Sequence, residues 1–292
     1  RKGQDGLWTA EIPAVKDGRW YFNQLFVNGQ RRTRARTPNE GFLRAAGPVP
    51  EIDDPHKHRG DIKACLGFSF KPGDIKRWDD LEDVNIVLYY DWSTSRHWIK
   101  ELDEERDVVR FTNRTGWPVC WWERDQRYHL ENYREALDQP GEWYLNRETG
   151  TLYYWPVKGE DPARATIVAP AFEHVVTIDG TPEQERYVDY LNLRGLSFQH
   201  ADWSFGREEQ LEAQAAVFCT GAVLARGARN CNIERCEIAH VGGYALWFEQ
   251  GCKSNRIFHC EVRDTGAGGI RVGETAYRDQ PSGELHLALV VG

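Results

Sequence analysis

The sequence lacks methionine altogether, although it has 292 residues and begins Arg1-Lys2-Gly3. Because translation starts with methionine, we expect the chain to be a processed protein or a segment of a longer one. It also lacks any run of about 18 apolar residues, which excludes a membrane-spanning helix and a membrane partner. Charged residues such as Glu11 and Lys16 exclude a secretion signal in the first 20 residues, so any such signal would precede Arg1.

Basic residues are too few for a nucleic-acid partner. The chain has 45 acidic and 37 basic side chains, a formal net charge of −8, whereas proteins that bind polyanions cluster Lys and Arg. Hydrophobic residues make up 40% of the sequence, and Trp, Tyr and Phe occur 12 times each. Such a chain can bury a core, which excludes global disorder.

Several common catalytic and metal-binding motifs are also missing. C-x-x-C, H-E-x-x-H, G-x-S-x-G and P-loop patterns do not occur, so no metal site is predicted and zincin or serine-hydrolase interpretations have no support. We expect the cysteines to be buried thiols that pack as small hydrophobic side chains, with one or two disulfides as the alternative in an exported protein. They are Cys65, Cys120, Cys219, Cys231, Cys236, Cys252 and Cys260.

Residues 1–160 have the pattern of short strands joined by turns, and we interpret them as an N-terminal β-rich region. The strand-like run 20–27 leads into Asn28-Gly29, a strong hairpin signal because both residues tolerate the positive φ of a type I′ turn. Further strands are expected over 84–90, 108–111, 142–145 and 151–155. The tryptophans of this region are expected in a core or an interface, with sugar platforms as the alternative: Trp92, Trp98, Trp117, Trp121 and Trp122.

Residues 161–292 contain a repeat. Residues 233–238 match 257–262 at an offset of 24, and 193–200 match 233–240 at an offset of 40. Self-similarity at such periods indicates a solenoid, in which each repeat packs on the next.

The repeat predicts a particular solenoid. Each turn of 24 residues holds three short apolar stretches, which favours a right-handed parallel β-helix over a leucine-rich repeat because the copies are not rich in leucine. The longer offset contains extra sequence at 203–219, where we predict a helix over 207–216. The predicted fold class is therefore all-β: a right-handed parallel β-helix over 161–292, preceded by a β-rich region over 1–160 with an inserted β-sandwich-like module.

The repeat also aligns polar residues in columns. His200, His240 and Asp264 occupy equivalent positions just after a strand on successive coils, which makes them a candidate sugar or metal site on a rigid scaffold. The alternative is that they cap turns, with Asp264 in an ordinary Asx turn.

A second column follows on the next strand. It places Trp247 over Arg271, with Tyr244 before them and Glu274 beside them. Aromatic rings beside carboxylates and an arginine suit carbohydrate, because rings stack on the apolar faces of sugars while charged groups bind hydroxyls. A solvated sheet face with ion pairs is the alternative.

Several longer stretches resemble a bacterial group of right-handed parallel β-helix proteins that includes glycoside hydrolase family 141. They are residues 20–29 (WYFNQLFVNG), 34–39 (RARTPN), 135–144 (EALDQPGEWY), 198–203 (FQHADW) and 264–271 (DTGAGGIR). The resemblance covers nearly the whole chain. It implies an enzyme with α-L-fucosidase activity on pectic polysaccharide or xylanase activity, secreted or periplasmic and monomeric.

The resemblance also implies that part of the enzyme is missing from this sequence. Members of the group have further strands before the position of Arg1 and further coils beyond Gly292, and the catalytic aspartates are placed on those later coils. This chain alone is therefore expected to lack the catalytic carboxylates. The best carboxylates it offers are Asp264, ranked first, then Asp202 and Glu274.

We interpret the parent protein as a glycoside hydrolase acting on fucosylated pectin or xylan of plants or algae, with a polysaccharide or oligosaccharide as partner and no cofactor. One alternative is a polysaccharide lyase, with Arg271 as the outward base and Ca²⁺ neutralising a uronate. Another is a non-catalytic carbohydrate-binding β-helix. The predicted substrate-binding residues are His200, Asp202, Trp203, His240, Tyr244, Trp247, Arg271 and Glu274, with Asp264 as the catalytic candidate.

Overall fold

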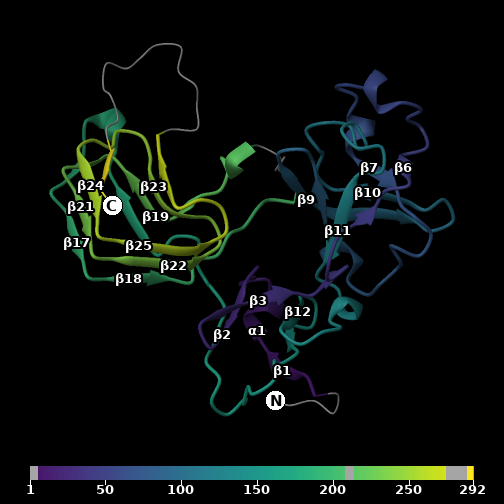
Figure 1. Cartoon of the computed structure of the whole chain (residues 1–292), viewed down its shortest axis with the longest axis horizontal. Helices are drawn as coiled ribbons and strands as arrows, with labels where there is room; N and C mark the ends of the chain where they lie inside the picture. The colour runs from purple at the N-terminus through teal and green to yellow at the C-terminus, as the bar shows by residue number, and fades with distance from the viewer. Residues whose placement is uncertain (1–5, 208–213, 274–287, 292) are drawn as a thin grey trace. The chain divides into compact units, whose positions relative to one another are not determined.

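The computed structural model describes residues 6–207, 214–273 and 288–291, and the chain divides into two compact units (Figure 1). The fold is all-β, as predicted: within the described residues the one α-helix is the four-residue α1 (Pro13–Lys16). No described helix is both long and apolar enough to cross a membrane. Unit 1 comprises Arg1–Tyr21, Leu25–Ile167 and Phe205–Gln214, and unit 2 comprises Phe22–Gln24, Val168–Ser204 and Ala215–Gly292.

Unit 1 contains a six-stranded sheet with the order β1-β13-β12-β3-β2-β14. The predicted hairpin occurs in it: β2 pairs with β3 across a two-residue turn in which Asn28 and Gly29 have φ of 54° and 72°. The strands expected over 142–145 and 151–155 are β12 and β13, and they pair with each other. The strands are β1 (Trp8–Glu11), β2 (Leu25–Val27), β3 (Gln30–Arg34), β12 (Glu142–Asn146), β13 (Thr151–Tyr154) and β14 (Ile167–Val168).

Strand β2 begins five residues later than the strand-like run 20–27 suggested. Asn23 and Gln24 lie in unit 2, where the Asn23 backbone N–H donates to the Asp202 carboxylate and the Gln24 amide donates to the Ala201 carbonyl. These bonds replace the cross-strand bonds that a longer β2 would make.

The second sheet of unit 1 has eight strands, with the order β4-β11-β8-β9-β10-β7-β6 and β5 beside β11. Its apolar face packs around fully buried rings that include Phe68, Phe111 and Tyr128. The strands are β4 (Arg36–Thr37), β5 (Leu43–Arg44), β6 (Gly47–Pro48), β7 (Gly67–Ser69), β8 (Asn85–Tyr89), β9 (Thr94–Asp103), β10 (Val108–Phe111) and β11 (Arg127–Glu131). The 3-10 turns are η1 (Pro55–Lys57), η2 (Ile62–Cys65), η3 (Leu81–Asp83) and η4 (Arg134–Ala136).

Unit 2 is built from parallel sheets, and its chain passes through them in the same order on each coil. The sheets have the orders β15-β19-β23-β26, β17-β21-β24-β27, β18-β22-β25 and β16-β20. Figure 1 shows β18, β22 and β25 lying side by side. The strands are β15 (Val176–Asp179), β16 (Val188–Asp189), β17 (Asn192–Arg194), β18 (Ser197–Gln199), β19 (Gly221–Arg226), β20 (Ala228–Arg229), β21 (Asn232–Glu234), β22 (Glu237–Val241), β23 (Tyr244–Phe248), β24 (Asn255–Phe258), β25 (Glu261–Thr265), β26 (Ile270–Val272) and β27 (Ala288–Val291).

The register of these sheets confirms both repeat offsets. Ile233 pairs with Ile257 and Ile238 with Val262, an offset of 24, whereas Phe198 pairs with Ile238, an offset of 40. Most of the helix predicted over 207–216 lies outside the described residues. The described end of that segment is not α-helical but a 3-10 turn, η6 (Gln214–Ala216), and the other 3-10 turn of unit 2 is η5 (Pro182–Gln184).

Stacked thiols line the core of unit 2. Cys236 donates to the carbonyl oxygen of Leu193 at 3.5 Å and Cys260 to that of Ile233 at 3.4 Å, so each thiol bonds to the equivalent carbonyl of the preceding coil. Cys252 makes the same kind of bond, to Ala225 at 3.2 Å, and burial raises its pKa to about 11. The thiols therefore pack as small hydrophobic groups with a weak donor, as expected.

Candidate functional site

The structure brings His200, His240 and Asp264 into one column in unit 2. They lie at the ends of neighbouring strands β18, β22 and β25. The two imidazole rings are stacked, with centroids 5.3 Å apart and planes inclined by 10°, and His240 Nδ1 lies 2.6 Å from Asp264 Oδ2. The predicted column therefore exists as a set of contacts.

A shared backbone conformation produces this column. His200, His240 and Asp264 have φ of 62°, 56° and 48°, in the left-handed region that His, Asn and Asp enter more readily than other non-glycine residues. One such residue at the same corner of each coil turns the chain and directs each side chain the same way. The parallel register then stacks the side chains.

A hydrogen-bond network fixes the state of His240. The Arg263 guanidinium, which can only donate, lies 3.2 Å from His240 Nε2. His240 Nε2 is therefore the acceptor, and Nδ1 carries the proton that it donates to Asp264. Arg263 also donates to Glu237 Oε1 at 3.0 Å.

Glu237 anchors this network on the surface of the sheet. Its carboxylate accepts hydrogen bonds from the Ser197 hydroxyl at 2.6 Å and the Gln199 amide at 2.8 Å, in addition to Arg263. These donors, the Ser197 hydroxyl first, lower the pKa of Glu237 to about 2. The Arg263 guanidinium is therefore held between the Glu237 carboxylate and the His240 ring.

Asp264 is the accessible member of the column. Its side chain is 33% exposed, whereas that of His240 is 8% exposed. A carboxylate that is held by a fixed imidazole and is one-third exposed can accept a hydrogen bond from a sugar hydroxyl or exchange a proton with a bound molecule.

The structure corrects the interpretation of Asp202 as an available carboxylate. Asp202 is 6% exposed, and its oxygens accept hydrogen bonds from the Asn23 backbone N–H and the Gln24 amide, both at 3.1 Å. The Trp203 carbonyl accepts from the Asn23 side chain at 2.8 Å. Asp202 and the Trp203 backbone therefore hold the 22–24 segment in unit 2.

This packing also requires a glycine on the next coil. A Cβ atom at Gly242 would lie 2.4 Å from Gln24 Nε2 and 2.5 Å from Trp203 Cδ1. Only a residue without a side chain fits that approach.

The second predicted column is assembled, but it is covered. The Arg271 guanidinium lies 4.0 Å from the centroid of the Trp247 ring and 5.5 Å from that of Tyr244, and it donates to the Cys219 carbonyl at 3.2 Å. Trp247 is 8% exposed and donates its indole N–H to the Gly273 carbonyl at 2.8 Å. Trp247 is thus buried instead of forming the open sugar platform expected for this face.

The remaining members of that column are similarly engaged or lie outside the description. The Tyr244 hydroxyl donates to the Ala215 carbonyl, and Arg271 also donates to the Val217 carbonyl. Arg271 is thus occupied by backbone carbonyls, which does not favour the base role that the lyase alternative assigned to it. Glu274 lies outside the described residues.

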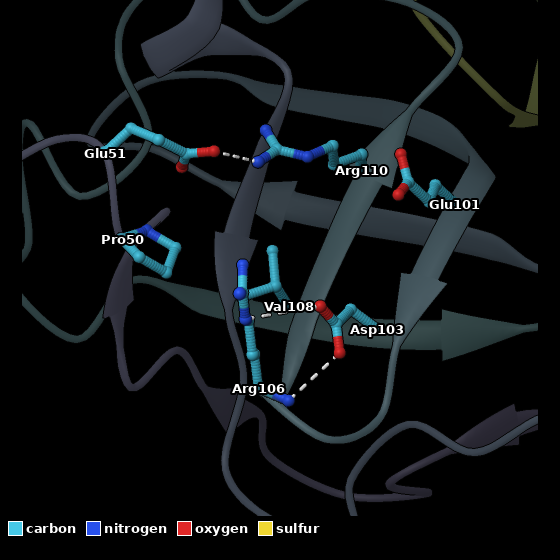
Figure 2. Close-up of a pocket in the computed structure, with 7 residues that line it drawn as sticks. All are labelled: Pro50, Glu51, Glu101, Asp103, Arg106, Val108 and Arg110. Carbon is cyan, nitrogen blue, oxygen red and sulfur yellow. Dashed lines mark hydrogen bonds and ion pairs between the residues drawn. The ribbon is translucent and has the colours of Figure 1, made fainter.

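A separate pocket of about 250 Å³ lies in unit 1 (Figure 2). Arg110 forms an ion pair with Glu51, and the Arg106 backbone N–H donates to Asp103 at 3.1 Å. A backbone hydrogen bond and the Arg110 guanidinium hold the pKa of Glu51 below its usual value. The pocket is lined by charged and aliphatic groups without an aromatic ring: Pro50, Glu51, Glu101, Asp103, Arg106, Val108 and Arg110.

Sequence reasoning missed Arg263 and Glu237, the residues that orient His240. The offset of 24 places Arg263 over Ala239 and Glu261 over Glu237, so the repeat alone could locate these positions on the strand before the column. The repeat could not show that the Arg263 guanidinium would bond to both Glu237 and His240. In the part of the chain that the structure describes, no three His, Cys, Asp or Glu side chains are grouped as metal ligands.

Comparison with known proteins adds two findings. Residues 5–157, which are 153 of the 292 residues, match the family model described as the GH141 insertion domain. A solved structure titled "Glycoside hydrolase" is similar in fold, with a TM-score of 0.72 and 21% sequence identity over 96% of this chain. The alignment covers 53% of that protein, so the chain spans about half its length. No curated protein matches the chain.

Proposed function

The chain belongs to the GH141 insertion domain family, and from this we propose that it is part of an exported glycoside hydrolase acting on plant or algal polysaccharide. Fucosylated pectin and xylan are the proposed substrates. Unit 1 contains most of the matched residues, and unit 2 carries the column of His200, His240 and Asp264.

Unit 2 is, in this proposal, a segment of a right-handed parallel β-helix. The support is that two parallel sheets, β17-β21-β24 and β18-β22-β25, share the offsets of 40 and 24 residues, so the chain returns to the same face on each coil. The hand follows from the general rule that crossover connections between parallel strands are right-handed in about 98% of cases. Such a scaffold holds side chains at its corners in fixed positions.

We assign Asp264 the role of contacting the sugar. Glycoside hydrolysis uses two carboxyl groups, about 5–5.5 Å apart in retaining enzymes and about 6.5–9.5 Å apart in inverting ones. Asp264 supplies one exposed carboxyl group, and His240 fixes its orientation. The second carboxyl group of the pair is placed outside the described residues, at Glu274 or on further coils of the complete enzyme.

The observation that carries this assignment is the 2.6 Å contact between His240 Nδ1 and an Asp264 carboxylate that remains one-third exposed. If Asp264 only capped a turn, it would not need a hydrogen bond from His240 with the tautomer of that imidazole fixed.

The test is Asp264→Asn in the complete gene product, assayed for release of reducing sugar from xylan and from fucosylated pectin. The isosteric amide keeps the shape of the column but cannot transfer a proton, so we expect kcat/KM to fall by about 100-fold or more. Asp189→Asn, an exposed carboxylate on β16, is the matched control and should retain full activity. Unchanged turnover in Asp264→Asn would exclude the assigned role.

A further inference from the structure

Unit 1 carries a cluster of four tryptophans at its surface: Trp92, Trp117, Trp121 and Trp122, called the tryptophan cluster below. Trp92 lies 4.6 Å from Trp122, Trp117 lies 5.3 Å from both Trp121 and Trp122, and these distances join ring centroids. Trp92 is 49% exposed, and the other three are half-buried. Trp98 is buried as expected and Trp122 packs against the core of unit 1, whereas Trp92 is exposed and does not lie in the core.

Two loops that are far apart in the sequence meet at the cluster. Trp92 lies in the connection between β8 and β9, and the other three rings follow β10. The buried Gln126 side chain links the two: its oxygen accepts from the Cys120 backbone N–H at 2.7 Å, and its amide donates to the Tyr89 carbonyl at 3.3 Å.

Backbone bonds to η2 hold the 115–122 loop as well. The Thr115 N–H donates to the Cys65 carbonyl at 2.8 Å, and the Val119 N–H donates to the Ala64 carbonyl at 2.9 Å. The rings are consequently positioned before any ligand arrives. Such preorganisation reduces the entropy lost on binding.

A third loop adds a cation to the cluster. The Arg59 guanidinium lies 4.5 Å from the centroid of the Trp117 ring, and the exposed His56 ring lies 4.7 Å from that of Trp121. Among the described residues, Arg59 has no carboxylate partner. Glu123, next to the cluster, is already paired with Arg44 and Arg127.

We propose that the tryptophan cluster and Arg59 form a second carbohydrate site, which binds an acidic polysaccharide that contains uronate residues. Indole faces stack on the apolar faces of pyranose rings, and a guanidinium on an aromatic ring pairs with a carboxylate. The proposal rests on the proposed function, because membership of a glycoside hydrolase family is what selects a glycan over a protein as the occupant of an exposed apolar patch.

The experiment measures binding separately from turnover. The complete gene product is run in native gels containing polygalacturonate or neutral xylan, and affinities for oligogalacturonides are measured by calorimetry. Trp92→Ala and Trp122→Ala should each weaken polygalacturonate binding about tenfold, the size expected when a central aromatic contact is truncated. Arg59→Ala should weaken binding to polygalacturonate more than binding to xylan, and Arg59→Lys should restore part of the loss.

Matched controls separate the site from general effects. Phe172→Ala removes a 73% exposed aromatic ring from unit 2, and Lys100→Ala removes an exposed positive charge from β9. Both should bind as the unchanged protein does. Because Trp92 lies at a loop tip, Trp92→Ala should melt within a few degrees of the unchanged protein, which excludes unfolding as the cause.

The outcomes distinguish this proposal from the proposed function. Polygalacturonate affinity unchanged in both tryptophan variants overturns the site, whatever the activity of the enzyme. Loss of self-association in these variants, with no retardation of the unchanged protein by either polysaccharide, identifies a protein interface and also overturns it. Loss of turnover in Asp264→Asn with full polygalacturonate binding supports two independent sites.

Discussion

Asn255 offers the sharpest test of how the coils of unit 2 are held together. It is 3% exposed and begins β24, where its Oδ1 accepts from the Cys231 backbone N–H at 3.0 Å and its Nδ2 donates to the Ala228 carbonyl at 2.8 Å. The Asn255 side-chain amide therefore bonds to the backbone of the preceding coil through both its oxygen and its nitrogen. The perturbation is Asn255→Ala, which removes both bonds without adding bulk.

The magnitude follows from these contacts. Each lost hydrogen bond removes about 1 kcal/mol, and a buried N–H left without an acceptor costs about 1–3 kcal/mol. The Ala228 carbonyl keeps a second donor, the Lys253 N–H at 3.0 Å, so only the Cys231 N–H is orphaned. We expect the free energy of unfolding of unit 2 to fall by about 3 kcal/mol.

The assay combines urea unfolding with hydrogen exchange of the peptide that contains Cys231. Asn192→Ala is the control, because Asn192 is exposed on β17 and bonds to the Asn232 side chain at 2.6 Å on the surface. The control should change stability by about 0.5 kcal/mol or less. Equal losses in the two variants, or unchanged exchange at Cys231, would refute the reasoning.

Two further predictions concern buried titratable groups. Burial raises the pKa of the Cys252 thiol to about 11 from its usual 9.0, so the unfolded chain loses its proton first and stability should fall as pH rises from about 9 to about 11. Alkaline urea titrations of Cys252→Ala should lack this fall in stability. Burial lowers the pKa of His97 to about 4 from 6.5, so the unfolded chain binds a proton first as the solution is acidified. The free energy of unfolding should therefore fall by about 3 kcal/mol as pH falls from 6.5 to 4. His97→Gln should flatten this part of the profile of stability against pH.

The register of unit 2 could be predicted because it depends on a repeat that is visible in the sequence. Apolar residues recur at fixed offsets, and parallel pairing places each copy on the one before, as Ile233 over Ile257 illustrates. The contact between His240 and Asp264 follows from the same arithmetic, because residues at one corner of successive coils must be neighbours.

Contacts outside the repeat could not be predicted in this way. The Asn23 N–H bonds to Asp202 across 179 positions, and no periodic pattern links the two. The burial of Trp247 depends on the 215–219 segment, whose carbonyls hold Arg271 beside it. Trp92 and Trp122 meet because Gln126 joins two loops, which is a property of the folded sheet and not of spacing.

The base of the 29–165 segment has an evolutionary consequence. Asn28 and Thr166 hydrogen-bond to each other, with the Asn28 N–H on the Thr166 carbonyl at 2.9 Å and the Thr166 N–H on Asn28 Oδ1 at 3.0 Å. The two ends of the 29–165 segment therefore lie side by side within unit 1, while residues 22–24 belong to unit 2. Inserts with adjoining ends can be gained, lost or exchanged between relatives at little cost in loop-closure entropy. A lineage could thus vary its surface tryptophans without disturbing the column at Asp264.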